Sequence, residues 1–171
     1  MSNKPNLEPE EASTALRVAR MSIFTALSVI GSFITPYPPI PTLAFDSCPG
    51  FFSALYFGVI EGALVTGLGH IITAVINGFP LGELHFIIAL GMALAGGAMG
   101  LVNKSNKKWG FIPAVITAVA INTGLSLVML PTMGWTAMLS FVAFPLLLAS
   151  SLNAILATLV YLGVKARRLN V

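Results

Sequence analysis

Long apolar runs alternate with short polar segments along this chain, and each run predicts a helix that crosses a membrane. Four runs are clear, and they cover residues 16–35, 84–102, 111–130 and 136–163. Each of them supplies the roughly 20 residues that an α-helix needs to cross the hydrocarbon core of a bilayer. A further apolar stretch, residues 50–77, is long for one helix and short for two full ones.

The positions of the basic residues decide how many times that further stretch crosses. Basic clusters lie at residues 17–20, 104–108 and 165–168, and such clusters gather on the cytoplasmic side of membrane proteins. If all three are cytoplasmic, the stretch at residues 50–77 contributes zero or two crossings. Two short or tilted helices, with a turn at Gly58 to Gly62, are favoured over a re-entrant hairpin. The prediction is an all-α integral membrane protein, a bundle of six transmembrane helices with both termini cytoplasmic.

The composition agrees with a chain that lies mostly in lipid. Hydrophobic residues make up 56% of the sequence and charged residues only 9%, whereas a soluble domain carries about 25% charged residues. The net charge of +3 is therefore interpreted as an orientation signal, and no nucleic-acid partner is predicted. We divide the chain into a polar N-terminal tail, residues 1–12, and a single transmembrane domain, residues 13–171.

Six crossings place three loops on the outer side, at residues 36–49, 78–83 and 131–135. The first has five prolines in fourteen residues, which predicts a stiff, extended segment. It is either a lid or wall of a pocket, or an ordinary connector. Within the helices, pairs of small residues four positions apart predict close contact between backbones; these are Gly58/Gly62, Ala63/Gly67, Ala89/Ala93, Gly96/Gly100 and Ala120/Gly124.

Polar side chains inside a membrane need a partner or a water-filled cavity, so each one is informative. Thr66, His70, Thr73 and Asn77 recur at the spacing of one helix face. That stripe is either the wall of a pocket open to the outer side or a set of hydrogen bonds between helices. In this arrangement Asn77 lies near the outer end of its helix and His70 lies near mid-depth.

Other polar residues are predicted near the same outer side. Asp46 either caps the following helix or bonds ligand hydroxyls. Glu83 is either solvated or favours the start of its helix, and His85 is expected to face the pocket. Asn122 is a pocket candidate, and Asn153 is expected to bridge helices instead.

The three outer loops each carry an aromatic residue: Tyr37, Phe79 and Trp135. These either anchor the membrane interface or stack on a planar ligand. Glu61 is assigned to the cytoplasmic interface, with a partner contact as the alternative. The predicted substrate-binding set is Tyr37, Asp46, His70, Asn77, Phe79, His85, Asn122 and Trp135.

No catalytic or nucleotide-binding motif is present in the sequence. It lacks an HExxH, a P-loop, a GxSxG and a dinucleotide-binding fingerprint. The two histidines also lack the helical pairing typical of a metal site. We therefore predict no catalytic residue, no metal and no cofactor. Because the chain is too small for the paired halves of most secondary transporters, energy for any transport would come from other subunits.

Several segments together resemble a known family. They are the basic segment that leads into a small-residue helix (residues 17–31), Pro36-Tyr37-Pro38-Pro39-Ile40-Pro41, Asp46-Ser47-Cys48-Pro49-Gly50-Phe51-Phe52, and the glycine-rich residues 58–63 and 67–70. With these, the chain resembles the substrate-binding S component of an energy-coupling-factor (ECF) vitamin transporter. The resemblance covers almost the whole chain after the tail.

The resemblance implies a multi-pass protein of the bacterial cell (inner) membrane that binds a vitamin or precursor on the outer side. Its partners would be a transmembrane coupling subunit and two ATPase subunits. In the family, an Ala-x-x-x-Ala motif of the first helix packs on the coupling subunit. The nearest matches here are Ser22-x-x-x-Ala26, which departs by one serine, and Ala15-x-x-x-Ala19.

The stretch from Asp46 to His85 looks most like members assigned to alpha-ribazole, the nucleoside-like precursor of the lower ligand of cobalamin. That substrate would suit the aromatic loops with its rings, and Asp46, Asn77 or His85 with its ribose hydroxyls. Riboflavin fits the same residues. Two other classes remain as alternatives: a membrane scaffold or assembly protein whose polar residues all join helices, and an intramembrane enzyme that uses His70 or Glu61.

Overall fold

A computed structural model describes residues 9–34, 44–106 and 108–169, and within these ranges the chain is helical and contains no strand. α1 begins inside the segment predicted as a polar tail, which agrees with the preference for proline in the first turn of a helix. In chain order the elements are α1 (Pro9–Ser32), the 3-10 helix η1 (Phe45–Ser47), α2 (Cys48–Tyr56), α3 (Val59–Ile76), α4 (Leu84–Asn103), α5 (Phe111–Gly124), the 3-10 helix η2 (Leu125–Met129), α6 (Leu130–Met138), the π-helical turn η3 (Leu139–Ala143) and α7 (Phe144–Leu169).

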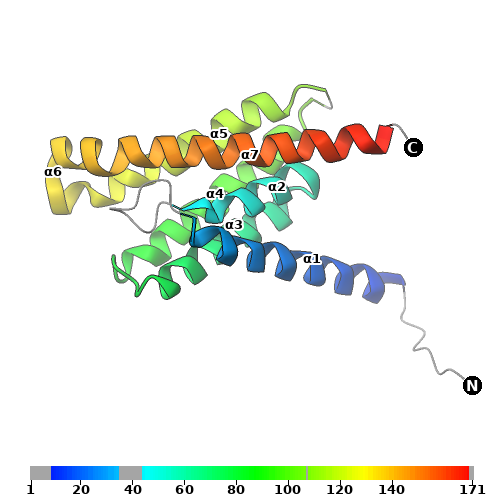
Figure 1. The fold of residues 1–171 in the computed structure, drawn as a ribbon, viewed down its shortest axis with the longest axis horizontal. Helices are drawn as coiled ribbons and strands as arrows, with labels where there is room; N and C mark the ends of the chain where they lie inside the picture. Colours follow the sequence, from blue (N-terminus) through cyan, green and yellow to red (C-terminus); the bar gives the residue numbers. More distant parts are fainter. Residues whose placement is uncertain (1–8, 35–43, 107, 170–171) are drawn as a thin grey trace, which may run out of the picture.

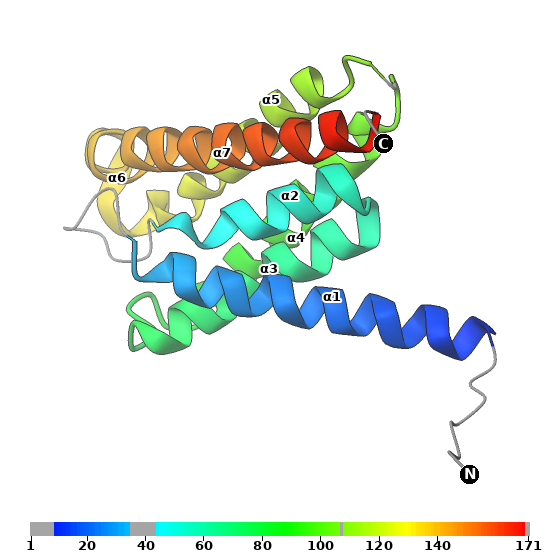
Figure 2. The same cartoon turned by 45° about the vertical axis from the view of Figure 1, so that its right-hand side comes forward.

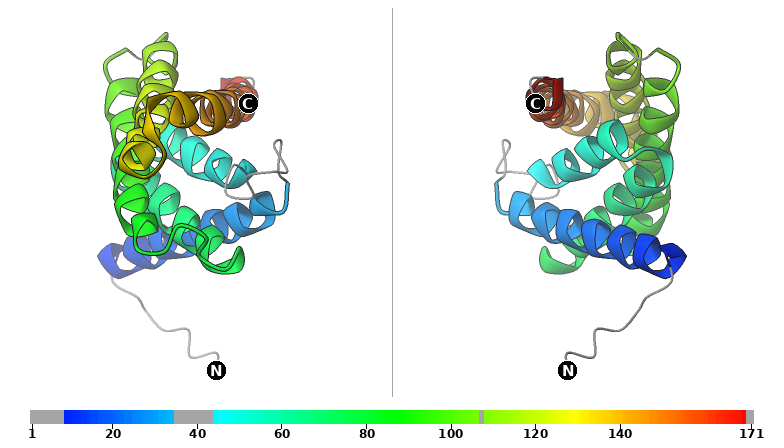
Figure 3. Two further views of the ribbon diagram at one scale, coloured as in Figure 1. Left: turned by 90° about the vertical axis from the view of Figure 1, so that its left-hand side faces the viewer. Right: turned by 90° about the vertical axis from the view of Figure 1, so that its right-hand side faces the viewer.

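The long helices form two rows. One row contains α1, α2 and α7, with α2 between the other two, and the second contains α3, α4 and α5 (Figure 2). The view along the bundle shows the same order, with α2 between α7 and α1 (Figure 3). The start of α1, the α4–α5 connection and the end of α7 lie at one end of the bundle, and η1, the α3–α4 turn and α6 lie at the other (Figure 1).

Four helical stretches of the described residues are long and apolar enough to cross a membrane: Ser13–Ser32, Val59–Ile76, Leu84–Asn103 and Phe111–Arg167. The last has 57 residues and folds back around α6, where Gly134 has a non-helical φ of 73°. α2 has only nine residues, so it spans about 14 Å. The all-helical fold and the apolar helices are therefore confirmed. The number of crossings and the side on which the termini lie stay predictions.

The predicted break within residues 50–77 falls at Gly58, between α2 and α3. Gly58 has a φ of +113°, a conformation that glycine adopts without the steric penalty of a side chain. The backbone N–H groups of Phe57 and Gly58 both donate to Ser53 O, at 2.8 and 3.1 Å, and so close α2. Gly62, predicted as the far side of this turn, lies inside α3 instead. The turn is short because one glycine is sufficient to reverse the chain.

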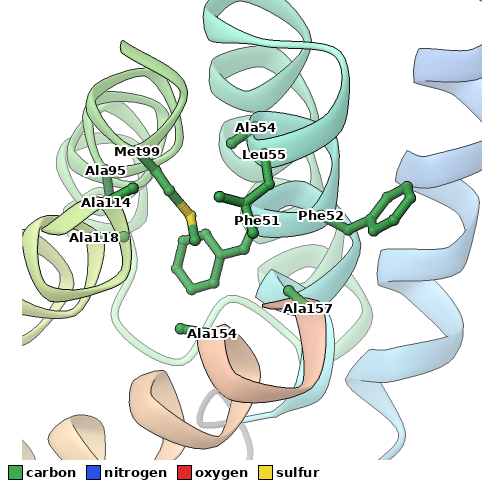
Figure 4. Close-up of a cluster of buried hydrophobic side chains, with 10 residues drawn as sticks. All are labelled: Phe51, Phe52, Ala54, Leu55, Ala95, Met99, Ala114, Ala118, Ala154 and Ala157. Atoms are coloured by element: carbon green, nitrogen blue, oxygen red, sulfur yellow. The ribbon is translucent and has the colours of Figure 1, made fainter. Parts of the chain in front are cut away.

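The apolar core lies around α2. Phe51 is completely buried and points into a space bounded by three other helices, whereas Phe52 points the opposite way, toward α1 (Figure 4). There the Phe52 ring stacks on Phe24 with the centroids 5.2 Å apart. α2 thus joins the two outer helices of its row. The residues that surround Phe51 are Ala95, Met99, Ala114, Ala118, Ala154 and Ala157.

α3 and α4 approach closely along a seam of small residues. A Cβ added at Gly62 would lie 2.9 Å from Gly96 O, and one added at Gly100 would lie 2.8 Å from the carbonyl carbon of Gly58. Any side chain there would force the backbones apart, so the predicted close packing is confirmed for these pairs. It is wrong for Gly124, where an added Cβ would have no neighbour within 4 Å.

Two segments predicted as outer loops are partly or wholly helical. Residues 45–49 belong to η1 and the start of α2, and residues 131–135 lie within α6. Proline is tolerated in the first turn of a helix because the N–H that it lacks would have no partner there. Pro49 and Pro131 therefore begin helices here. The predicted turn at residues 78–83 is confirmed, and residues 35–43 of the first loop lie outside the described part of the chain.

Candidate functional site

A cavity of about 330 Å³ lies at the end of the bundle that holds η1, the α3–α4 turn and α6. Its described lining comes from these elements and from α3, α4, α5, η2, η3 and α7. Most of the lining is apolar, and a few polar groups converge on it, which is the usual form of a small-molecule site. These polar residues are Asp46, Ser47, His70, His85, Asn122, Ser126, Ser150 and Asn153.

η1 carries Asp46 into the cavity wall. The backbone N–H of Phe45 donates to Ile34 O at 3.0 Å, and Asn153 Nδ2 of α7 donates to Ala44 O at 3.0 Å. These two bonds hold η1 between the end of α1 and α7. Ser47 Oγ donates to Asp46 Oδ1 at 3.0 Å. Asp46 is consequently buried, with 4% of its surface exposed, although it follows a loop in the sequence.

Burial raises the pKa of the Asp46 carboxyl from 3.8 to about 6, and the hydrogen bond from Ser47 partly opposes this rise. Burial acts in this direction because a low-dielectric environment disfavours the charged form. The folded protein therefore holds this proton more tightly than the unfolded chain does. Its contribution to the free energy of unfolding is present at low pH and is lost as the pH rises through about 6. At neutral pH the carboxyl group is mostly ionised.

Two buried histidines connect Asp46 with the α3–α4 turn. The backbone N–H of Leu81 donates to His85 Nε2 at 3.3 Å, and His85 Nδ1 lies 3.2 Å from His70 Nε2. His70 Nδ1 lies 4.0 Å from Asp46 Oδ2. Because the Leu81 amide can only donate, His85 Nε2 must accept and the proton of a neutral His85 lies on Nδ1. The same reasoning puts the His70 proton on Nδ1, facing Asp46.

The opposite wall is formed by α5 and α7. Asn122 Nδ2 donates to Ser150 Oγ at 3.1 Å. Asn153 Nδ2 donates to Ala149 O at 2.9 Å as well as to Ala44 O. Both amide protons of Asn153 are therefore used, while its Oδ1 is buried and has no hydrogen-bond partner. A buried acceptor without a donor is costly, so this oxygen is a candidate contact for a ligand.

The structure brings together four residues of the predicted binding set: Asp46, His70, His85 and Asn122 all line the cavity. Three others lie elsewhere. Asn77 follows the end of α3 and donates from Nδ2 to Thr73 O at 2.8 Å. Phe79 packs on His85 with the ring centroids 5.0 Å apart and is not in the described lining. Trp135 of α6 is 61% exposed, and Tyr37 lies outside the described residues.

Four polar residues of the lining were not in the predicted set: Ser47, Ser126, Ser150 and Asn153. Asn153 was expected only to bridge helices, and it does so while also lining the cavity. A usable signal was present in α7, because Leu146, Ala149, Ser150 and Asn153 share one helix face. Small and polar residues there interrupt an otherwise apolar helix. The signal for Ser47 was weaker, since it lies next to a loop.

The other end of the bundle carries charged contacts of a different kind. Arg17 Nε donates to Glu61 Oε1 at 2.9 Å, and the Arg20 guanidinium lies 4.9 Å from the centroid of the Phe57 ring. Glu61 is therefore buried in an ion pair within the chain. These contacts tie the first half of α1 to the α2–α3 turn, and none of the four residues lines the cavity. Among the described residues, no group of three or more His, Cys, Asp or Glu side chains can hold a metal ion.

Comparison with known families identifies the class of this protein. Residues 16–164 match the sequence model of the family described as "ECF transporter, substrate-specific component". The chain belongs to this family. No curated protein and no solved structure matches it. Family membership makes it a membrane transport component with a small-molecule substrate and ECF-module partners, and the family is one of transporter components rather than enzymes.

Proposed function

We propose that this chain is an S component of the bacterial cell membrane that captures a vitamin or vitamin precursor from outside for ATP-driven uptake. The mostly apolar cavity with its eight polar lining residues carries this proposal, because an assembly protein has no need of polar groups that converge on an apolar hollow. In this arrangement the chain crosses the membrane six times, with both termini cytoplasmic and the cavity at the outer end. The described basic residues belong to the first half of α1, the α4–α5 connection and the end of α7, which lie at the end of the bundle opposite to η1 and α6 (Figure 1), and this supports the orientation.

Alpha-ribazole is the preferred substrate within this proposal. The cavity of about 330 Å³ is near the lower limit of the usual 300–1,000 Å³ range for small-molecule sites. Such a cavity suits alpha-ribazole better than riboflavin, which is the larger molecule. Apolar walls would hold the ring system, and Asp46 and Asn122 are candidates to bond the ribose. His85 is not, because both of its ring nitrogens are engaged, with the Leu81 N–H and with His70. Riboflavin is the second candidate because it also combines planar rings with hydroxyls.

The exposed face of α1 supports docking on a coupling subunit. Ala15, Ala19, Ser22 and Ala26 are all exposed and recur at the spacing of one helix face. The residues of α1 that pack on α2 and α3, such as Phe24 and Ser28, lie on another face. Small side chains allow a partner helix to approach closely in lipid. We propose that this face contacts the transmembrane subunit, which in turn carries the two ATPases.

Mass spectrometry of the detergent-purified chain is the direct test of this function. We expect a cobalamin-precursor nucleoside to co-purify, and added alpha-ribazole to raise the melting temperature at saturation. Binding at a Kd of 1 μM with ligand at 100 times that value would add about 2.7 kcal/mol to the free energy of unfolding. If neither alpha-ribazole nor riboflavin stabilises the protein, and no small molecule co-purifies, the scaffold alternative is favoured.

Asn122→Ala is expected to weaken ligand binding about tenfold, the effect of one lost hydrogen bond of about 1.4 kcal/mol. Isothermal titration with alpha-ribazole measures the change. Asn106→Ala is the matched control, because Asn106 is exposed in the α4–α5 connection at the other end of the bundle. Equal losses in the two variants would contradict a role for Asn122 in the cavity. The same assay on Asn77→Ala tests the sequence prediction for that residue.

A further inference from the structure

The hydrogen-bonding groups of the cavity are unequal in number, and acceptors exceed donors. The His70 and His85 protons point along the chain of contacts that ends at Asp46, and the Leu81 amide fixes their direction. Asn153 uses both amide protons on Ala44 O and Ala149 O. None of these groups has a proton left for a ligand. The serines and Asn122 can donate or accept, so they do not decide whether the ligand must bring donors or acceptors.

Two buried oxygens remain as acceptors. Asn153 is 2% exposed and its Oδ1 has no hydrogen-bond partner. Asp46 is 4% exposed; its Oδ1 accepts from Ser47 Oγ, its Oδ2 lies 4.0 Å from His70 Nδ1, and a carboxylate can accept further hydrogen bonds. Both residues line the cavity, from η1 and from α7. Buried acceptors of this kind are satisfied by a ligand that brings O–H or N–H donors.

The charged residues around the cavity also restrict the ligand, because they disfavour a negative charge. No lysine or arginine is among its described lining residues. The described basic side chains belong to the start of α1, the α4–α5 connection and the end of α7, at the opposite end of the bundle (Figure 1). An anionic ligand would meet the Asp46 carboxylate in a mostly apolar hollow with no cation to balance its charge, which is strongly unfavourable.

We infer that the cavity selects a neutral ligand whose hydroxyl or N–H donors bond Asp46 and Asn153 Oδ1, and that it rejects the phosphate ester of the same ligand. This inference rests on the proposed function and specifies its substrate class. For a nucleoside-like precursor, the chain takes up the dephosphorylated form.

Matched pairs of probes test this selection on the detergent-purified full chain. The pairs are alpha-ribazole with its 5′-phosphate and riboflavin with flavin mononucleotide, and titration calorimetry measures each Kd. We expect the phosphate ester to bind about 100-fold more weakly than its neutral partner, as expected for an uncompensated charge in a site of low dielectric. This comparison needs no variant. An ester that binds as tightly as its neutral partner would overturn the inference and leave the proposed function standing.

Asp46→Asn identifies the residue that rejects the anion. The variant keeps an acceptor oxygen and removes the charge. The Kd of the ester divided by the Kd of its neutral partner should therefore fall about tenfold relative to the wild type. Glu83→Gln is the matched control, because Glu83 is an exposed carboxylate of the α3–α4 turn outside the cavity lining; its ratio should equal that of the wild type. An unchanged ratio in a folded Asp46→Asn variant would overturn the role of Asp46. Failure of all four probes to bind the wild type would contradict the proposed function and this inference together.

Discussion

Ala26→Trp is expected to abolish vitamin uptake and to leave ligand binding unchanged. Ala26 is exposed on α1, on the same face as Ala15, Ala19 and Ser22, and it does not line the cavity. A tryptophan there would hold a partner helix away from a surface that is otherwise made of small side chains. The effect on uptake should be large because ATP-driven transport requires the docked complex.

Two assays on the same variant separate docking from binding. Uptake of labelled alpha-ribazole is measured in cells that also contain the coupling subunit and the ATPases, and the Kd is measured by calorimetry on the purified chain. Leu159→Trp is the control, since Leu159 is an apolar residue of α7 that is 62% exposed. Normal uptake by Ala26→Trp would disprove the proposed docking face, and a raised Kd would mean that the substitution disturbs the bundle.

Gly96→Ala is expected to lower the free energy of unfolding by about 3 kcal/mol, at the upper end of the usual cost of overpacking. A Cβ at Gly96 would collide with Thr66 Oγ1 and the Gly62 carbonyl, including the Gly62 carbonyl carbon at 2.8 Å. Two of these contacts are backbone atoms of α3, so no flexible side chain can move aside. The α3–α4 pair would have to separate, and the His70–His85 contact joins the same two helices.

The next residue in the chain provides the control. A Cβ at Gly97 would lie 3.5 Å from Ala63 Cβ and 3.8 Å from Val59 Cγ1, which are ordinary contacts. Gly97→Ala should therefore be neutral or should stabilise the helix by up to about 1 kcal/mol. Melting curves of both variants in one detergent measure the difference. Equal melting temperatures for Gly96→Ala and Gly97→Ala would contradict the close α3–α4 contact.

Hydropathy found the long helices because a membrane helix must be apolar over most of its length. It failed at α6 and at the start of α2 for the same reason. Where nearly every residue is apolar, a short helix and an apolar loop have the same hydropathy, and proline is compatible with both. Pro131 therefore suggested a loop, whereas it lies in the first turn of a helix. Gly58 was easier to identify, since a glycine in the middle of an overlong apolar stretch is a natural point of reversal.

Some residues of the candidate site could likewise be predicted from the sequence, and others could not. Asp46, His70, His85 and Asn122 were identified because ionisable and amide groups are rare and costly in a membrane. Asn77 shares a helix face with His70, but it is at the end of α3 and bonds its own backbone. Helical spacing predicts the direction of a side chain and not its depth relative to a cavity. The unpaired Asn153 Oδ1 was invisible to this method, because it depends on where Ala44 lies.

The sequence by itself determined that this protein is helical, apolar and built for a membrane, and it identified the rare polar residues that need an explanation. These properties follow from composition and from spacing along one chain. Only the tertiary structure decided which of those residues share a cavity, in which direction the His70 and His85 protons point, and that Asn153 Oδ1 lacks a donor. The physical reason is that hydrogen bonds such as Leu81 to His85 and Asn153 to Ala44 depend on where turns and neighbouring helices lie, and a uniformly apolar pattern does not specify those positions.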